Sequence, residues 1–141
     1  MIVRALILGA LWLVSQIALA SPHCADFLQA LARKPPNLEF IECKAGHEQQ
    51  LRALVASYRV DGRHAAAIER YLVRHTGMSR LRFACCGWEP NTRKIQRTGH
   101  VPSSPAYEIT MASEETVVAR RSDWSQIPWF YVTVTLPLEA P

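Results

Sequence analysis

The first twenty residues constrain the fold more than any other feature, because their pattern is that of a cleavable export signal. Arg4 provides a positive charge and an apolar run extends from Ala5 to Val14. Residues 18–20 read Ala-Leu-Ala, in which Ala18 and Ala20 are the small residues that signal peptidase requires. The apolar run is shorter than the roughly 20 residues that span a bilayer. These small residues disfavour a retained N-terminal anchor. We therefore expect residues 1–20 to be removed, leaving a periplasmic or secreted protein without stable membrane insertion.

Residues 21–141 are the right length for one domain, and their four cysteines indicate how that domain is held together. An even number of cysteines in an oxidising compartment indicates disulfides, whereas the same set in the cytosol would suggest metal binding or catalysis. The four cysteines are Cys24, Cys43, Cys85 and Cys86, and they can be joined into two disulfides in three different ways.

The hydrophobic pattern predicts both helices and strands. Apolar residues recur at helical spacing in two segments, Asp26–Arg33 and Arg63–Thr76. Five segments alternate or are dense in β-branched and aromatic residues, and these predict strands: Leu38–Cys43, Leu51–Val60, Leu81–Cys85, Tyr107–Ser113 and Trp129–Leu136. We interpret three further segments as non-repetitive, namely a polar loop at Lys44–Gln50, a rigid turn at Cys86–Pro90 and an exposed loop at Asn91–Pro105. We predict no secondary structure for Glu114–Ile127, because its sequence shows neither period.

The segment Arg63–Thr76 has the clearest helical pattern. Asp61 is suited to cap its N-terminus, and Gly77 supplies the left-handed residue that ends it. Its apolar face would turn toward a sheet, and the opposite face carries the charged residues, among them Glu69 and Arg70. The element order predicts an α+β domain with a mainly antiparallel sheet of about five strands and two helices packed on one face.

The expected topology suggests how the cysteines pair. If the first helix packs antiparallel to the first strand, Cys24 lies beside Cys43, and a bridge there adds about 3 kcal/mol on the loop-entropy model. A crossover helix would make Leu81–Cys85 parallel to Leu51–Val60, placing its cysteines at the other edge of the sheet. Cys85 and Cys86 would then pair with each other or stay free. Should this strand order be wrong, Cys24–Cys86 with Cys43–Cys85 is the alternative.

No complete catalytic or cofactor-binding set is present. The spacing of Cys43 and His47 occurs in metal sites, but no second pair completes four ligands. The sequence has no glycine-rich phosphate loop and no Gly-x-Ser-x-Gly elbow. We expect neither a metal nor a cofactor. A cysteine nucleophile would have to use Cys85 or Cys86, with a base among His64, His75 and His100.

Basic residues cluster in the middle of a chain whose charge after signal removal is +3. The cluster is either a solvated face or a docking surface for an acidic partner. No nucleic-acid-binding module accompanies it, so we expect no nucleic-acid partner. Trp88, placed on a predicted turn, is a candidate contact residue. The candidate interaction residues are Trp88, Arg70, Arg74, Arg93 and Lys94.

Several motifs resemble an uncharacterised family of small exported bacterial proteins with a Cys-Cys-Gly-Trp-Glu motif. They are Phe83–Glu89, the strand Leu38–Cys43, the turn at Tyr58–Gly62 and Asp123-Trp124. The resemblance extends from Cys24 to about Val134 and implies localisation in the bacterial envelope.

Small exported domains of this kind often prove to be binding proteins, including immunity proteins that block toxins. We therefore expect a binding protein without catalytic activity, an inhibitor or immunity-type protein whose partner is an envelope or toxin protein. The alternative is a periplasmic enzyme or redox protein that uses Cys85 or Cys86.

Overall fold

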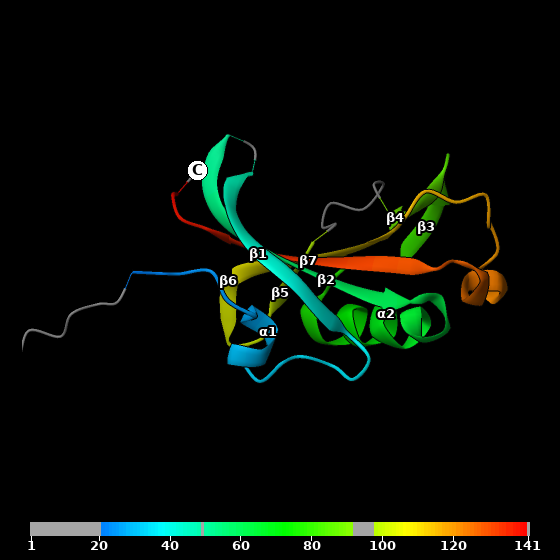
Figure 1. Ribbon diagram of the computed structural model, residues 1–141, viewed down its shortest axis with the longest axis horizontal. Helices are drawn as coiled ribbons and strands as arrows, with labels where there is room; N and C mark the ends of the chain where they lie inside the picture. Colours follow the sequence, from blue (N-terminus) through cyan, green and yellow to red (C-terminus); the bar gives the residue numbers. More distant parts are fainter. Residues whose placement is uncertain (1–20, 49, 92–97, 141) are drawn as a thin grey trace, which may run out of the picture.

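The structure, a computed structural model, describes residues 21–48, 50–91 and 98–140 (Figure 1). The predicted export signal, residues 1–20, lies outside the described residues. The fold is α+β, as the sequence predicts, with a five-stranded antiparallel sheet and a separate two-stranded sheet. Across the larger sheet the strands run in the order β1 (Glu39–Glu48), β2 (Leu51–Asp61), β7 (Trp129–Pro137), β6 (Ser104–Ser113) and β5 (Gly99–Val101).

One face of the large sheet forms the core. Tyr58 of β2 and Phe130, Val132 and Val134 of β7 all point to this face and have no exposed surface. The helices α1 (Phe27–Ala30) and α2 (Gly62–Thr76) lie on the same side of the sheet (Figure 1). This arrangement confirms the predicted packing of two helices on one face. None of the helices in the described part of the chain is long and apolar enough to cross a membrane.

The helix α2 begins at Gly62, one residue before the predicted start at Arg63, and has the predicted end and caps. The Asp61 carboxylate accepts a hydrogen bond from the Arg63 backbone N–H, and Gly77 adopts φ 76° at the C-terminal end. Gly62 packs so closely on the 3-10 helix η1 (Arg121–Gln126) that a Cβ there would lie 2.0 Å from the Trp124 carbonyl oxygen. The start of α2 therefore has no room for a side chain.

The predicted loop at Lys44–Gln50 is wrong, because β1 continues to Glu48 and pairs with β2 as far as Leu51. The strand β1 is an edge strand that pairs only with β2, and most of its residues are exposed. Both faces of β1 can therefore carry polar side chains, and its sequence lacks the alternation of apolar and polar residues that marks a half-buried strand.

The segment Leu81–Cys85 is a strand, but its predicted place in the main sheet is wrong. Among the described residues, the strand β3 (Leu81–Ala84) pairs with β4 (Gly87–Pro90), so of the predicted turn at Cys86–Pro90 only Cys86 lies in a turn and the rest is strand. The position beside β2 belongs to β7, whose apolar residues suit the centre of a sheet better than the short β3.

The predicted loop Asn91–Pro105 is also wrong where it is described. Residues 92–97 lie outside the described part, but Gly99–Val101 forms β5 and β6 begins at Ser104. The strand β5 has only three residues, which is too short to show a periodic pattern.

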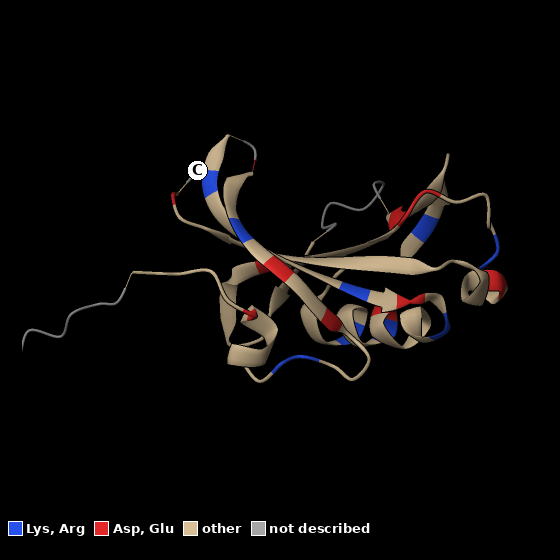
Figure 2. Ribbon diagram, in the orientation of Figure 1, with Lys and Arg blue, Asp and Glu red and all other residues tan. Residues whose placement is uncertain are grey.

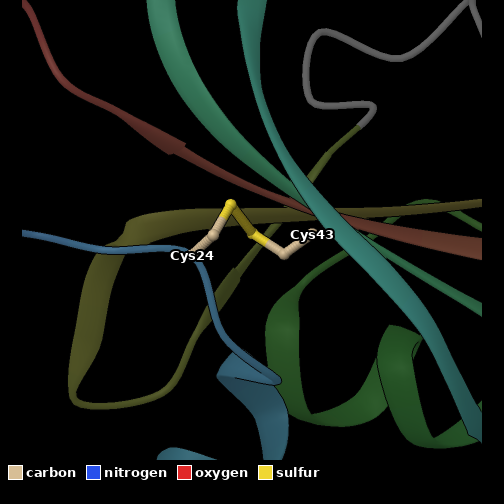
Figure 3. The surroundings of a disulfide bond; sticks show 2 residues. All are labelled: Cys24 and Cys43. Carbon is tan, nitrogen blue, oxygen red and sulfur yellow. A yellow bond between two sulfur atoms is a disulfide. The ribbon is translucent and has the colours of Figure 1, made fainter.

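A cysteine pair ties the segment before α1 to the edge of the sheet (Figure 3). Cys24 and Cys43 lie with Cα atoms 5.4 Å apart and sulfurs 2.13 Å apart, which is the pairing expected from the packing of the first helix. The sulfurs of Cys85 and Cys86 lie 2.14 Å apart. Both pairs are therefore at disulfide distance, although the strand order used to place Cys85 and Cys86 was wrong.

Candidate interaction surfaces

A groove of about 520 Å³ runs along α2 and is lined by three arginines, Arg70, Arg74 and Arg80. Arg70 and Arg74 are one helical turn apart, so their side chains leave the same face of α2, and Arg80 follows the helix. All three are exposed. Figure 2 shows basic residues spaced along α2. The structure therefore brings the predicted candidates Arg70 and Arg74 together and adds Arg80.

The arginines of this groove, which we call the α2 groove, have no counter-charge within the part of the chain that the structure describes. None of them forms an ion pair there. Beside them, the rings of Tyr71 and His75 are in contact, with centroids 4.6 Å apart and planes tilted by 39°. The groove thus combines guanidinium groups that can bind carboxylates with an aromatic surface.

The acidic residue in the groove wall, Glu69, is not available to neutralise these arginines. The sequence places Glu69 on the charged face of the helix, but the side chain is only 2% exposed, which corrects that expectation. Its Oε1 accepts the Leu81 backbone N–H at 2.8 Å, and its Oε2 is bound by the Arg121 guanidinium. Arg121 also donates to the Leu81 carbonyl at 2.7 Å. This network holds η1, α2 and the start of β3 together.

Trp88, a candidate contact residue, lies in the core of the structure. It is 6% exposed, its indole Nε1 donates to the Val118 carbonyl at 2.9 Å, and its ring lies 5.0 Å from that of Trp124. A second ring contact, 5.8 Å to Phe83, joins β4 to β3. Trp88 therefore anchors the hairpin to the core. The other two candidates, Arg93 and Lys94, lie outside the described residues.

The turn between β3 and β4 presents the Cys85–Cys86 pair at the surface. Both residues are exposed, and two surface hollows of about 470 Å³ each open onto them. The Cys86 carbonyl accepts the Thr116 N–H at 2.7 Å, which fastens the turn to the segment after β6. The hollows are lined further by three carboxylates and an apolar side chain: Glu89, Glu114, Glu115 and Val117.

The three histidines considered as a base lie apart from this cysteine pair. His64 bonds to the Asp61 carboxylate, the His75 ring contacts that of Tyr71, and His100 bonds to the Pro105 carbonyl. None of them lines either hollow. Among the described residues, no group of three or more His, Cys, Asp or Glu side chains is arranged to hold a metal ion.

Two aspartates have shifted ionisation for structural reasons. Partial burial would raise the pKa of Asp61, but hydrogen bonds from Arg63 and His64 outweigh it and lower the pKa to about 2. The same balance lowers the pKa of Asp26, where burial is outweighed by bonds from Lys34, the Gln29 N–H and Tyr58. Burial, with the Asp26 carboxylate beside it, raises the pKa of the Tyr58 phenol. Asp26 and Asp61 cap helices, so the shifts in their pKa values reflect folding.

A family model described as a domain of unknown function, DUF4952, matches residues 15–88, which is more than half of the chain. The chain belongs to the DUF4952 family. The match includes the α2 groove and all four cysteines, and it ends within β4. The strands β5, β6 and β7 therefore follow the matched DUF4952 region, although β7 pairs directly with β2 inside it. No match was found among the curated proteins or among the solved structures.

The DUF4952 match agrees with the expectation of an uncharacterised family. Export of its members, their bacterial origin and the Cys-Cys-Gly-Trp-Glu motif as a family signature stay predictions.

Proposed function

We propose that this DUF4952 protein is an exported binding protein without catalytic activity, an inhibitor or immunity-type protein that binds an acidic segment of an envelope or toxin protein in the α2 groove. The observation that supports this most is the set of three exposed arginines, Arg70, Arg74 and Arg80, lining one groove without an ion-pair partner among the described residues.

The groove has the chemistry that recognition of carboxylates needs. A guanidinium group binds a carboxylate through two parallel hydrogen bonds, which gives orientation as well as charge. Two arginines one turn apart on a helix of 15 residues are held at a fixed spacing, so a partner with similarly spaced carboxylates would lose little further freedom on binding. The rings of Tyr71 and His75, which contact each other beside the arginines, would supply an apolar surface to the partner.

The alternative, a periplasmic enzyme with Cys85 or Cys86 as nucleophile, requires a free thiolate. Both residues lie in a pair at disulfide distance, and the histidines lie elsewhere. These observations favour binding over cysteine catalysis.

A charge-matched comparison tests the proposal. The double variant Arg70→Gln/Arg74→Gln removes two charges from the groove. The control, Arg52→Gln/Arg120→Gln, removes two charges from exposed side chains outside it. The probe is a fluorescein-labelled peptide rich in glutamate, with a lysine-rich peptide of equal length for comparison, and binding is followed by fluorescence anisotropy. Two partly exposed ion pairs contribute about 1–2 kcal/mol, so we expect the groove variant to bind the acidic peptide about ten-fold more weakly.

The control variant should bind the acidic peptide as the unmodified protein does. Equal weakening in both double variants would indicate only a general effect of net charge and would contradict the proposal. Equal binding of the acidic and basic peptides would also contradict it. In a pull-down from the envelope fraction, a partner retained by the protein and by the control variant, and lost with the groove variant, would identify the acidic protein.

A further inference from the structure

The adjacent cysteines suggest a second activity that does not depend on the α2 groove. We propose that the Cys85–Cys86 disulfide is a redox site, reduced reversibly by the dithiol of a partner protein while Cys24–Cys43 stays oxidised. Three observations carry this proposal: the accessibility of the two pairs, the small role of a bond between neighbours in holding the fold, and the surface around the turn.

The two pairs differ in access. Thiol–disulfide exchange requires a thiolate to reach one of the bonded sulfurs, so exposed disulfides react and covered ones do not. Cys85 and Cys86 are both exposed, with the two hollows opening onto them. Cys24 and Cys43 are only partly exposed and pack against the hydrophobic core. A reductant would therefore reach Cys85–Cys86 first.

Reduction at this turn should leave the fold intact. A disulfide stabilises mainly by restricting the unfolded chain, more for a longer loop, and a bond between neighbouring residues closes almost no loop. The contacts that anchor the hairpin do not involve the sulfurs: Trp88 is held by the Val118 carbonyl, by the Ser113 hydroxyl at 2.8 Å and by the ring of Trp124. Cycling between the two states is therefore compatible with a folded protein.

The exchange is balanced by the dithiol alone. A thiolate of the partner attacks the sulfur of one cysteine, the bond between Cys85 and Cys86 breaks, and the other cysteine leaves as a thiolate that takes a proton. The second thiolate of the partner then attacks the mixed disulfide and releases the first cysteine. Two electrons and two protons pass to Cys85 and Cys86, and the partner becomes a disulfide.

The surroundings of the turn indicate which kind of reductant fits. Glu89, Glu114 and Glu115 line the hollows and would repel a small thiol that carries additional negative charge. Val117, 95% exposed, lies beside the pair and offers an apolar contact to a docking protein. A protein dithiol with a neutral or basic apolar surface suits this site better than an anionic small thiol.

The test is differential thiol labelling of the folded protein in dithiothreitol, followed by mass spectrometry of the alkylated peptides. We expect two alkyl groups on the peptide that contains Cys85 and Cys86, introduced at least ten-fold faster than any on Cys24 or Cys43. Tryptophan fluorescence should keep its folded value. In a reduced sample that has not been alkylated, an oxidised dithiol should restore the starting mass. Labelling of all four cysteines together, reduction only after unfolding, or earlier reduction of Cys24–Cys43 would each overturn the proposal.

A second experiment, with two small thiols, tests whether the carboxylates around Cys85 and Cys86 disfavour a negatively charged reductant. We expect Glu115→Gln to speed reduction by mercaptoethanesulfonate about two-fold more than reduction by mercaptoethanol, because one repelling charge is removed. The control Glu108→Gln changes a carboxylate on β6 outside both hollows and should alter neither rate. Equal responses of the two thiols to Glu115→Gln would contradict the proposed role of the carboxylates. Loss of acidic-peptide binding at the α2 groove would leave all these results unchanged.

Discussion

The ion pair between Glu69 and Arg121 should be the most sensitive polar contact in the molecule. Arg121→Met would keep most of the side-chain volume but leave the Glu69 carboxylate, 2% exposed, without its counter-charge. Glu69 would keep the Leu81 N–H bond at 2.8 Å, and the Leu81 carbonyl would lose the Arg121 donor at 2.7 Å. The substitution therefore leaves a buried carboxylate without the guanidinium group that balances its charge.

The expected loss follows from these contacts. Breaking a buried ion pair by removing one partner costs about 3–5 kcal/mol, because the remaining charge is uncompensated. The lost position of the guanidinium over the Trp124 ring, 4.5 Å from its centroid, adds about 0.5–1 kcal/mol. Arg121 itself is 31% exposed, so water can reach part of the site and reduce the loss. We expect the free energy of unfolding to fall by about 4 kcal/mol, a large share of the roughly 5–15 kcal/mol typical of a domain.

Urea unfolding of a double-mutant cycle measures this. Glu69→Gln keeps an acceptor for the Leu81 N–H and leaves Arg121 partly solvated, so it should cost less, about 1–2 kcal/mol. In Glu69→Gln/Arg121→Met no charge is left buried. The double variant should therefore lose at least about 1 kcal/mol less free energy of unfolding than the two single variants lose together. A loss below about 1 kcal/mol for Arg121→Met, or additive losses, would refute the view that an unpaired Glu69 charge dominates.

Three further changes test other parts of the fold. Cys24→Ser should lower the free energy of unfolding by about 2–5 kcal/mol in chemical denaturation, and a loss within error would show that the bridge to Cys43 contributes little. Gly62→Ala should prevent stable folding, seen as loss of the cooperative thermal transition, because its Cβ would lie 2.0 Å from the Trp124 carbonyl oxygen; an unchanged melting temperature would contradict this packing. Asp61 has a pKa of about 2 when folded against 3.8 unfolded, so its charge stabilises fully above about pH 4 and less as the pH falls to about 2. Asp61→Asn keeps the helix cap, and its stability deficit should shrink over that pH range; a deficit independent of pH would refute the linkage.

The elements that the sequence predicts well are those whose burial shows in local periodicity. The strands β2 and β7 and the helix α2 each place their apolar residues at the spacing of their own backbone, and Asp61 and Gly77 mark the helix ends. The fold class follows from these elements and their order.

The features that were missed depend on residues distant in the sequence. Glu69 has the charge of a surface residue, and only Arg121, 52 positions later, makes its burial favourable. Trp88 follows a turn, yet Trp124 and Val118 enclose it. Arg121 itself lies in Glu114–Ile127, where the sequence has no regular period, so a buried charge opposite it could not be anticipated. The helix itself offered one signal. Glu69 lies one turn after Ala65 and directly after Ile68, so it borders the apolar face of the helix, where a side chain becomes buried.

The place of β7 in the sheet has a consequence for the order of folding. Synthesis delivers the N-terminal strands first, so β2 must wait with an unpaired edge until residues 129–137 emerge to fill the centre of the sheet. An unpaired strand edge is a template for aggregation, and pairings between distant segments form slowly. Chains halted before Trp129 should therefore be cleaved rapidly by protease, and protection before that point would contradict this order. A cell that makes this protein must keep its first half apart from other chains until the last strand arrives.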